Sequence, residues 1–322
     1  MEMLLAAAVV VIIGVILFKY LDCDLTLLWN IKFGKQSSDL VGKVVWITGC
    51  SSGIGEALAY EFASAGCRLV LSARRENLLN KVKQKCIETS RGALTSDDIL
   101  VQPLDLLDYN SHPSVTETVF KYFKKVDILV NNAGRSQRGL IVETALEVDR
   151  QVFDLDLLAP ISVTKAILPY MIKQGGGHIM CTSSVAGKLG APGSASYTAA
   201  KHGIQGFFDT LRIECAPDSI SITMACPGPV FSEALVHAFT SEPNKKLNVE
   251  MKKSWNRMTA ERCAYLMGVA AANKLHEVWL TPNPELFYCY LFQYIPYFAK
   301  KIAVKLGQGR ANKVKAGIAD LH

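Results

Sequence analysis

Thr48-Gly49-Cys50-Ser51-Ser52-Gly53-Ile54-Gly55 is the stretch of this chain that decides the fold. The apolar run Val44–Ile47 precedes it, and a segment with helical periodicity, Glu56–Phe62, follows it. A β-branched run, a glycine-rich turn and a helix make up the βα unit that binds a nucleotide. The glycines let the backbone approach a pyrophosphate, and the helix N-terminus supplies N–H donors and a positive potential. The stretch therefore predicts a dinucleotide site, although an ordinary glycine-rich loop is the alternative.

Further strand-like runs follow along the chain, separated by segments of helical length. The longest of these segments extends from about Glu147 to Lys173. Strands that alternate with helices indicate one open parallel sheet. The chain has 322 residues, half of them apolar, which is enough to bury such a core. We therefore predict an α/β fold with a doubly wound, Rossmann-like parallel sheet in a single domain. The predicted strands are Val44–Thr48, Arg68–Ser72, Ile99–Pro103, Asp127–Asn131, Gly177–Thr182 and Ile220–Cys226.

Charge and cysteine usage exclude several classes of function. The formal net charge of +6 is modest, and no basic segment interleaves with aromatic residues as a nucleic-acid platform would. We therefore predict no nucleic-acid partner. The nine cysteines are odd in number and form no C-x-x-C pair, so we expect buried thiols. Neither a disulfide framework nor a metal site is predicted.

The N-terminus has the composition of a membrane segment. Met3 to Phe18 is a run of sixteen apolar residues without a charge, preceded only by Glu2 and followed by Lys19. The run is short for a span of about 20 residues, but a lysine side chain can extend it. We predict that residues 1–21 form a retained single-pass anchor, with a cleaved signal peptide as the alternative. Basic residues after the run favour a cytosolic main domain, but only weakly. The orientation of the anchor in the membrane therefore stays open.

The remaining chain divides into three regions by composition. Residues 22–42 are expected to be a linker, and residues 43–280 the dinucleotide-binding catalytic domain. Within that domain the strand–helix rhythm stops after Pro227-Gly228-Pro229, and residues 228–258 are expected to form a mobile lid. Residues 281–322 are an apolar, aromatic extension with a basic end, which could contact anionic lipid headgroups.

Tyr197 and Lys201 are the first candidates for chemistry. They are four residues apart in Tyr197-Thr198-Ala199-Ala200-Lys201, so a helix would place both side chains on one face. A free phenol loses its proton only near pH 10, which is too high for acid–base work at neutral pH. A neighbouring cation stabilises the phenolate and makes such a side chain a usable proton donor.

The same spacing recurs at Tyr297 and Lys301, so the spacing alone is not decisive. Ser184 stands thirteen residues before Tyr197, at the end of a predicted strand, whereas Pro284 stands thirteen before Tyr297. A serine at the carboxyl edge of a parallel sheet faces the crevice in which such sheets bind ligands. We therefore assign the chemistry to the first pair and expect the second to lie on a helix beside a membrane.

These motifs together resemble those of the classical short-chain dehydrogenase/reductase superfamily over about residues 41 to 280. The glycine-rich turn has the spacing G-x-x-x-G-x-G of that superfamily, not G-x-G-x-x-G. Shorter stretches indicate a closer resemblance to one subgroup. The matching motifs are Thr48–Gly55, Asn131-Asn132-Ala133-Gly134, Ser184, Tyr197, Lys201 and Pro227-Gly228, and the subgroup stretches are Asp24–Trp29, Ser136–Arg138 and Glu277–Trp279.

The resemblance implies a role for each matching residue. Tyr197 would donate a proton to the carbonyl oxygen, Lys201 would assist it and bind the nicotinamide ribose, and Ser184 would orient the carbonyl. Asn132 would shape the sheet near the cofactor. The residues implied to bind the cofactor are Thr48, Gly49, Ser51, Ser52, Gly53, Ile54, Gly55, Arg74, Arg75, Asp105, Leu106, Asn132, Ala133, Gly134, Tyr197, Lys201, Pro227, Gly228, Val230 and Ser232.

One position bears on the choice of coenzyme, and another on whether the family's set of catalytic residues is complete. Ala73 stands where NAD-using relatives have an acidic residue, and Arg74 follows it, which favours NADP(H). Asp156, thirteen residues before the Leu168-Pro169 that should end the long helix, stands where the family has Asn. The family's Asn holds a water that links the lysine to solvent. A carboxylate could hold that water too, but its charge would oppose the effect of Lys201 on Tyr197.

The function predicted is therefore an NADPH-dependent oxidoreductase that interconverts carbonyl and alcohol groups of hydrophobic substrates. The resemblance suggests steroids or retinoids, and long-chain acyl compounds would also suit a lipid-bound enzyme. The expected location is a membrane, that of the endoplasmic reticulum, and a homodimer is possible. The alternative is a non-catalytic, cofactor-binding scaffold or sensor protein at the membrane, with a catalytic set weakened by Asp156.

Overall fold

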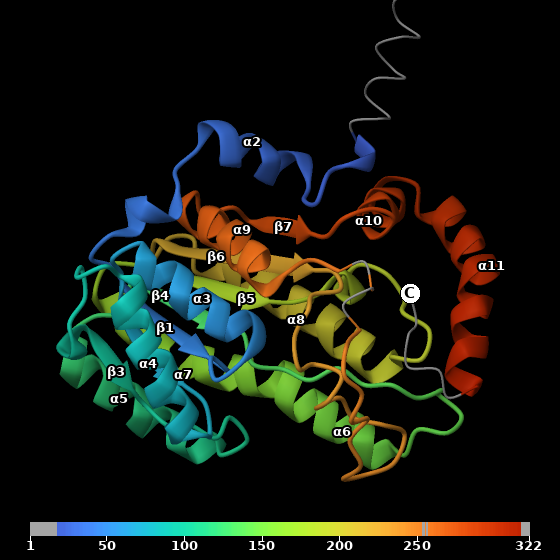
Figure 1. Ribbon diagram of the computed structural model, residues 1–322, viewed down its shortest axis with the longest axis horizontal. Helices are drawn as coiled ribbons and strands as arrows, with labels where there is room; N and C mark the ends of the chain where they lie inside the picture. Colours follow the sequence, from blue (N-terminus) through green and yellow to red (C-terminus); the bar gives the residue numbers. More distant parts are fainter. Residues whose placement is uncertain (1–17, 253–254, 256, 317–322) are drawn as a thin grey trace, which may run out of the picture.

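The computed structural model describes residues 18–252, 255 and 257–316. Seven parallel strands form one sheet in the order β3-β2-β1-β4-β5-β6-β7 (Figure 1). The predicted doubly wound α/β fold is confirmed, and each predicted strand is present within two residues of its expected bounds. The strands are β1 (Val44–Thr48), β2 (Arg68–Ser72), β3 (Ile99–Val101), β4 (Ile128–Asn131), β5 (Gly177–Thr182), β6 (Ile220–Pro227) and β7 (Glu277–Leu280). Only β7 was not predicted.

Helices cover both faces of the sheet, which is why the central strands are continuous apolar runs. All five residues of β1 are buried. One face packs against α3 (Gly53–Ser64), α4 (Glu76–Thr89) and α9 (Ala260–Ala272). The other packs against α5 (His112–Phe123), α7 (Ala159–Lys173) and α8 (Ala195–Glu214). Short helical turns connect these elements: η2 (Ser96–Asp98), η3 (Tyr109–Ser111) and η5 (Val185–Gly187).

The long helix predicted from Glu147 to Lys173 is present but not regular. It consists of α6 (Leu146–Phe153), a π-helical turn η4 (Asp154–Leu158) and α7. Pro169 lies inside α7, so the expectation that Leu168-Pro169 ends the helix is wrong. Among the described residues, only this helix is long and apolar enough to cross a membrane. Its residues Val163, Ile167 and Met171 belong to the core beneath the sheet, which accounts for its apolar character.

The segment 22–42, expected to be a linker, is folded onto the domain. It contains α2 (Leu25–Phe33) and η1 (Ser37–Leu40), and Figure 1 shows α2 lying over α9. Asp24 fixes its start, because its carboxylate accepts from the backbone N–H groups of Leu27, at 2.9 Å, and Trp279, at 2.7 Å. The linker interpretation is therefore corrected. The anchor predicted for residues 1–21 falls almost entirely outside the described residues.

The C-terminal extension forms two helices beside the carboxyl ends of the strands. They are α10 (Glu285–Tyr294) and α11 (Pro296–Lys315). The segment expected to be a lid, 228–258, is irregular where it is described. It makes an isolated bridge to a neighbouring loop, Phe239 with Gln137, and another between its own two ends, Val230 with Met258. These two segments and the strand ends enclose the main cavity of the described structure.

Candidate active site

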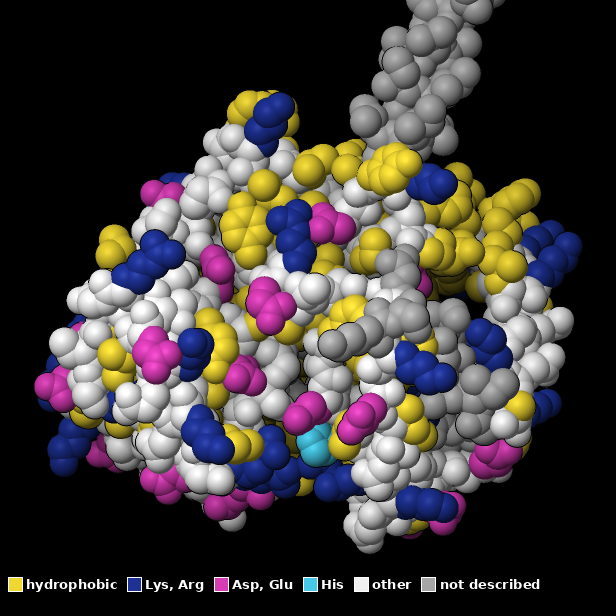
Figure 2. Space-filling model, viewed as in Figure 1, with side chains coloured by type: hydrophobic (Ala, Val, Ile, Leu, Met, Phe, Trp, Pro, Cys, Tyr) yellow, Lys and Arg dark blue, Asp and Glu magenta, His cyan; other side chains and the backbone are white. Residues whose placement is uncertain are grey.

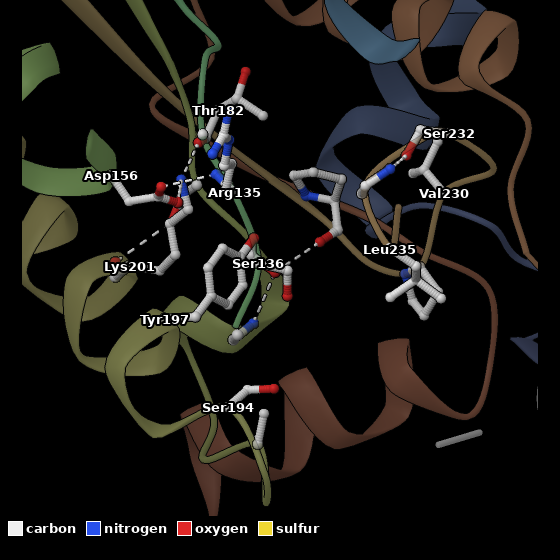
Figure 3. A pocket seen from close by; sticks show the side chains of 18 of the residues that line it. Arg135, Ser136, Asp156, Thr182, Ser194, Tyr197, Lys201, Val230, Ser232 and Leu235 are labelled. Carbon is white, nitrogen blue, oxygen red and sulfur yellow. Dashed lines mark hydrogen bonds and ion pairs between the residues drawn. The ribbon is translucent and has the colours of Figure 1, made fainter. Parts of the chain in front are cut away.

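A cavity of about 1100 Å³ lies at the carboxyl ends of the strands. This is the edge at which open parallel sheets bind ligands. The glycine-rich turn and the arginines after β2 line one part of it, α8 lines another, and α10 and α11 add an apolar wall. Figure 3 shows polar side chains of several elements pointing into it, among them Tyr197, Lys201 and Ser232.

The glycines of the turn are required by close backbone packing. Gly49 has a φ of +67°, and a Cβ there would lie 2.7 Å from Cα of Ala133. A Cβ on Gly55 would lie 2.3 Å from the carbonyl oxygen of Gly49. A Cβ on Gly53 would meet only Ser232, at 3.2 Å, so this face of the backbone stays open toward the cavity. The N-terminus of α3, with its unpaired N–H groups, is thereby approachable by an anion.

Asn132 ties three strand ends together behind the turn. Its side-chain amide donates to the carbonyl oxygens of Thr48, at 3.2 Å, and Gly49, at 3.3 Å, and its backbone N–H donates to Thr48 Oγ1 at 3.1 Å. Thr182 Oγ1 donates in turn to Asn132 Oδ1 at 3.3 Å. Thr48 is buried by these contacts and does not line the cavity, unlike the other implied cofactor residues.

The end of β2 makes one side of the cavity strongly cationic. Arg74 and Arg75 follow Ala73 there, are exposed and line the cavity. Arg75 Nη2 donates to Ser51 Oγ at 3.3 Å, which connects the pair to the turn. Arg135 lies near enough that burial, and next the charge of Arg74, lower its pKa. An anionic ligand group would relieve this repulsion.

The three residues assigned to chemistry are brought to one cavity. Tyr197 and Lys201 lie one turn apart on α8, with Lys201 Nζ 5.5 Å from the centre of the tyrosine ring. The same Nζ donates to the carbonyl oxygen of Thr182 at 3.1 Å. Ser184 ends the loop after β5, where its Oγ donates to the carbonyl oxygen of Pro227 at 3.3 Å. All three side chains line the cavity.

Asp156 forms a buried ion pair with Lys201. Its Oδ2 lies 3.3 Å from Lys201 Nζ, and its Oδ1 accepts from the backbone N–H of Arg135 at 2.8 Å. Asp156 is wholly buried, so a solvent-facing side chain is excluded, and the contact is direct where a bridging water was expected. Burial is the strongest single influence on Lys201 and lowers its pKa, but Asp156, Tyr197 and Cys181 act together against it and raise the pKa of the lysine above its usual value. Burial raises the pKa of Asp156 itself, and Lys201 acts against that shift.

Close contacts with neighbouring side chains of the protein explain why positions 134 and 228 are glycine. A Cβ on Gly134 would lie 2.9 Å from Asp156 Oδ2, and one on Gly228 would lie 2.0 Å from Thr281 Oγ1. The other implied residues have side chains or backbone at the cavity surface. These are Ser51, Ser52, Ile54, Asp105, Leu106, Ala133, Pro227, Val230 and Ser232.

Sequence reasoning missed the wall that faces the tyrosine. Tyr288 and Phe292 of α10 and Ile302, Leu306 and Arg310 of α11 line the cavity. Two further arginines, Arg138 and Arg257, line it from loops. The spacing of 302, 306 and 310 on one helical face was the available signal, but nothing in it indicates which surface the helix covers.

Comparison with known proteins places these features in context. Residues 43–243 match the model of the short chain dehydrogenases. Human Dehydrogenase/reductase SDR family member 7 is 42% identical to this chain over 98% of it and 93% of that protein. The mouse protein of the same name is 41% identical over 97% of this chain and 92% of its own. The predicted resemblance is thereby confirmed.

Solved structures share the fold. An alcohol dehydrogenase from the archaeon Thermococcus sibiricus, complexed with 5-hydroxy-NADP, aligns with a TM-score of 0.64 at 24% identity, over 75% of this chain and 97% of its own. Levodione reductase aligns with a TM-score of 0.65 at 23% identity, over 76% of this chain and 98% of its own. At these identities the likeness concerns the fold alone.

Proposed function

The chain belongs to the short chain dehydrogenase family, and on that premise we propose that it is an NADP(H)-dependent oxidoreductase that interconverts carbonyl and alcohol groups of apolar substrates. The observation that carries the proposal is the meeting of Ser184, Tyr197 and Lys201 in one cavity with an anion-binding helix N-terminus. A scaffold protein would have no need of a buried lysine beside a tyrosine at that place.

The residues present fit a phosphorylated dinucleotide. The open backbone at Gly53 and the start of α3 suit a pyrophosphate, and Arg74 and Arg75 suit a ribose 2′-phosphate. When bound, such a cofactor supplies or accepts the hydride. The position of Ala73, where an acidic residue would bind an unphosphorylated ribose, supports NADP(H) over NAD(H).

The proton chemistry belongs to the chain's own residues. In the reducing direction Tyr197 donates its phenolic proton to the carbonyl oxygen, and the charge of Lys201 stabilises the phenolate that remains. Ser184 Oγ, which now donates to Pro227, can instead donate to the substrate carbonyl and hold it in place. Asp156 holds Lys201 in place and partly neutralises its charge, because its carboxylate lies 3.3 Å from the ammonium group.

An exposed apolar band supports action at a lipid surface. Figure 2 shows hydrophobic side chains gathered over α2, α10 and α11. Aromatic side chains prefer the membrane interface, and lysines attract anionic headgroups. Because α10 and α11 also line the cavity, an apolar substrate could enter from the lipid. The band consists of Leu25, Leu28, Trp29, Phe33, Phe287, Tyr294, Ile295, Tyr297 and Phe298, flanked by Lys19, Lys32, Lys300 and Lys301.

A direct test measures NADPH oxidation by the detergent-purified protein with a panel of apolar ketones and aldehydes, including steroid and retinoid carbonyls. We expect turnover of some members and none with the Tyr197→Phe variant. Binding of NADPH without turnover of any carbonyl or alcohol would contradict the proposal and support the scaffold alternative.

Coenzyme choice has its own test in Arg74→Ala. We expect NADPH binding to weaken by about tenfold or more, because a charge-assisted hydrogen bond to the phosphate is lost. NADH binding should change little, as measured by titration of protein fluorescence. An equal loss for both coenzymes would show that Arg74 does not bind the 2′-phosphate.

A further inference from the structure

The substrate side of the cavity holds cationic groups that the proposed chemistry does not use. Arg138, Arg257 and Arg310 line the cavity together with Tyr197. The dinucleotide phosphates are already accounted for by the turn and the arginines after β2. Arg138 and Arg310 therefore need a separate explanation.

Arg138 is held beside the catalytic helix. Its Nη1 donates to the carbonyl oxygen of Gln137 at 2.8 Å, to Ser194 Oγ at 2.9 Å and to Ser136 Oγ. Ser194 directly precedes α8, three residues before Tyr197. Arg138 Nε is buried without a hydrogen-bond partner in the described structure. The guanidinium is thus fixed near the tyrosine with donor capacity to spare.

Arg310 reaches the same region from α11. The helix packs on the loop before α8 at two points that flank this arginine. A Cβ on Gly307 would lie 3.1 Å from Pro192 Cγ, and a Cβ on Gly193 would lie 2.6 Å from Val314 Cγ2. Arg310 Nε, too, is buried without a hydrogen-bond partner among the described residues. Its place is set by these contacts, because glycine lets the helix and loop approach.

The charges of these arginines oppose one another. Burial, and next the charge of Arg310, lower the pKa of Arg138 to about 9. Burial also lowers the pKa of Arg310, Glu285 acts against that shift, and Arg257 adds to it. No carboxylate of the described residues forms an ion pair with Arg138 or Arg310. Half-buried guanidinium groups that repel one another and have no ion-pair partner among the described residues are costly, and a bound anion would offset that cost.

Besides Glu285 and Tyr288, the wall around the arginines holds several apolar side chains. Leu189, Phe292, Ile302, Ala303 and Leu306 line it. An apolar ligand body could lie along α11 while a polar end meets the guanidinium groups. A neutral hydrocarbon would leave the Nε groups of both arginines without an acceptor, and a cation would be repelled.

We propose that the physiological substrate carries an anionic group, a carboxylate or a sulfate, which Arg138 and Arg310 bind while its carbonyl or alcohol group lies at Tyr197. This rests on the proposed oxidoreductase function and narrows its substrate to acidic, otherwise apolar compounds. Guanidinium groups suit both oxoanions, because their N–H groups form paired hydrogen bonds with two oxygens.

The test compares matched substrates on the full-length protein in detergent with NADPH. One pair is a keto fatty acid and its methyl ester, and the other is a steroid ketone with and without a sulfate. We expect kcat/KM to be at least about tenfold higher for the charged member of one pair, because charge-assisted hydrogen bonds are strong. The pair that shows the preference identifies the anion as carboxylate or sulfate.

Variants of α11 test whether Arg310 causes the preference for the charged substrate. Arg310→Gln should bring the charged-to-neutral ratio of kcat/KM close to one, and Arg310→Glu should invert it. Lys305→Gln removes a cation from the exposed side of the same helix and should leave the ratio unchanged. Equal use of both members by the wild-type protein, or an unchanged ratio in Arg310→Glu, would overturn the proposal.

A binding measurement separates this proposal from the oxidoreductase proposal. With NADP⁺ present, the keto acid should raise the melting temperature of the wild-type protein more than its ester does, and Arg310→Glu should abolish the difference. If no carbonyl compound is reduced but this difference appears, the oxidoreductase proposal fails and the anion site stands. If turnover occurs without any difference between acid and ester, the anion site fails alone.

Discussion

Two tyrosine–lysine pairs with the same spacing lie in opposite surroundings in this protein. Lys201 Nζ lies 5.5 Å from the ring centre of Tyr197 on α8, and Lys301 Nζ lies 4.6 Å from that of Tyr297 on α11. The local contact is thus nearly the same. Lys201, however, is 3% exposed, whereas Lys301 is exposed to solvent and its partner Tyr297, in the apolar band, is 71% exposed.

The difference shows that helical spacing creates the contact but not the chemistry. Lys201 has two further oxygen partners, the carbonyl of Thr182 and the carboxylate of Asp156, and both are held by the strand and helix ends around it. The charge of an exposed lysine is screened by water, while that of a buried lysine acts on its neighbours at low dielectric. Burial and second partners therefore distinguish a reactive pair from a surface pair.

Of all the exchanges, replacing each tyrosine by phenylalanine should give the largest difference in kcat between the two pairs. Tyr197→Phe removes the proton donor and should lower kcat by about a thousandfold or more, while NADPH binding stays close to wild type. Tyr297→Phe should leave kcat unchanged. Steady-state kinetics and coenzyme titration on both variants check this, and similar behaviour of the two would break the comparison.

Replacing each lysine by methionine tests the buried ion pair. Lys201→Met leaves the carboxylate of Asp156 buried and unpaired, so it should lower the free energy of unfolding by about 3 kcal/mol besides reducing activity. Lys301→Met should change neither. The double variant Lys201→Met/Asp156→Asn should recover much of the stability without recovering the activity, as measured by thermal unfolding and kinetics. An equally unstable double variant would show that the ion pair is not the cause.

Asp156→Asn should change the activity less than Lys201→Met does, because Tyr197 and Lys201 are both retained. The charge of Lys201 would no longer be neutralised, so it should act more strongly on Tyr197 and favour the phenolate. We expect turnover to be kept or raised and the pH–rate profile to move to lower pH by about one to two units. A tenfold loss of turnover with no shift of the profile would mean that the carboxylate itself has a role in the reaction.

The exposed pair should matter only for lipid binding. Phe18 and Leu21 pack against the cluster that contains Trp279, so a chain beginning at residue 18 should stay folded. We expect this truncated chain to bind anionic vesicles weakly, and Tyr297→Ser with Lys301→Ser to reduce that binding by a few fold in flotation assays. Tyr122→Ser, an exposed tyrosine on α5, is the control. If the control and the α11 variant bound alike, the apolar band would not be a membrane contact.

Most of the fold could be predicted from the sequence, since buried parallel strands are continuous apolar runs. The exception, β7, has four residues and directly follows a polar loop, so its pattern is too short to stand out. Helix α2 was missed because it follows the apolar N-terminal run, and its packing on α9 depends on residues 240 positions away, such as the Asp22–Arg262 ion pair.

The residues of the site that belong to sequence motifs could be predicted. Those that are brought to the site by tertiary packing could not. Ser184, Tyr197 and the glycine-rich turn meet because strand ends of a parallel sheet share one edge. The direct contact of Asp156 with Lys201 depends on a π-helical turn, which changes the helical phase and has no sequence signature. Arg138 and Arg310 come together only because α11 folds back on the loop before α8.

The position of α11 in the chain also affects how the molecule is made. The turn that suits the coenzyme is translated early, while the wall that includes Arg310 comes from α11, the last helix that the structure describes. During synthesis the nucleotide half of the cavity can therefore form before the half that selects the substrate. A premature stop codon within α11, at position 310 or earlier, would yield a protein with Tyr197 and Lys201 in place but without part of the surface that the substrate lies against.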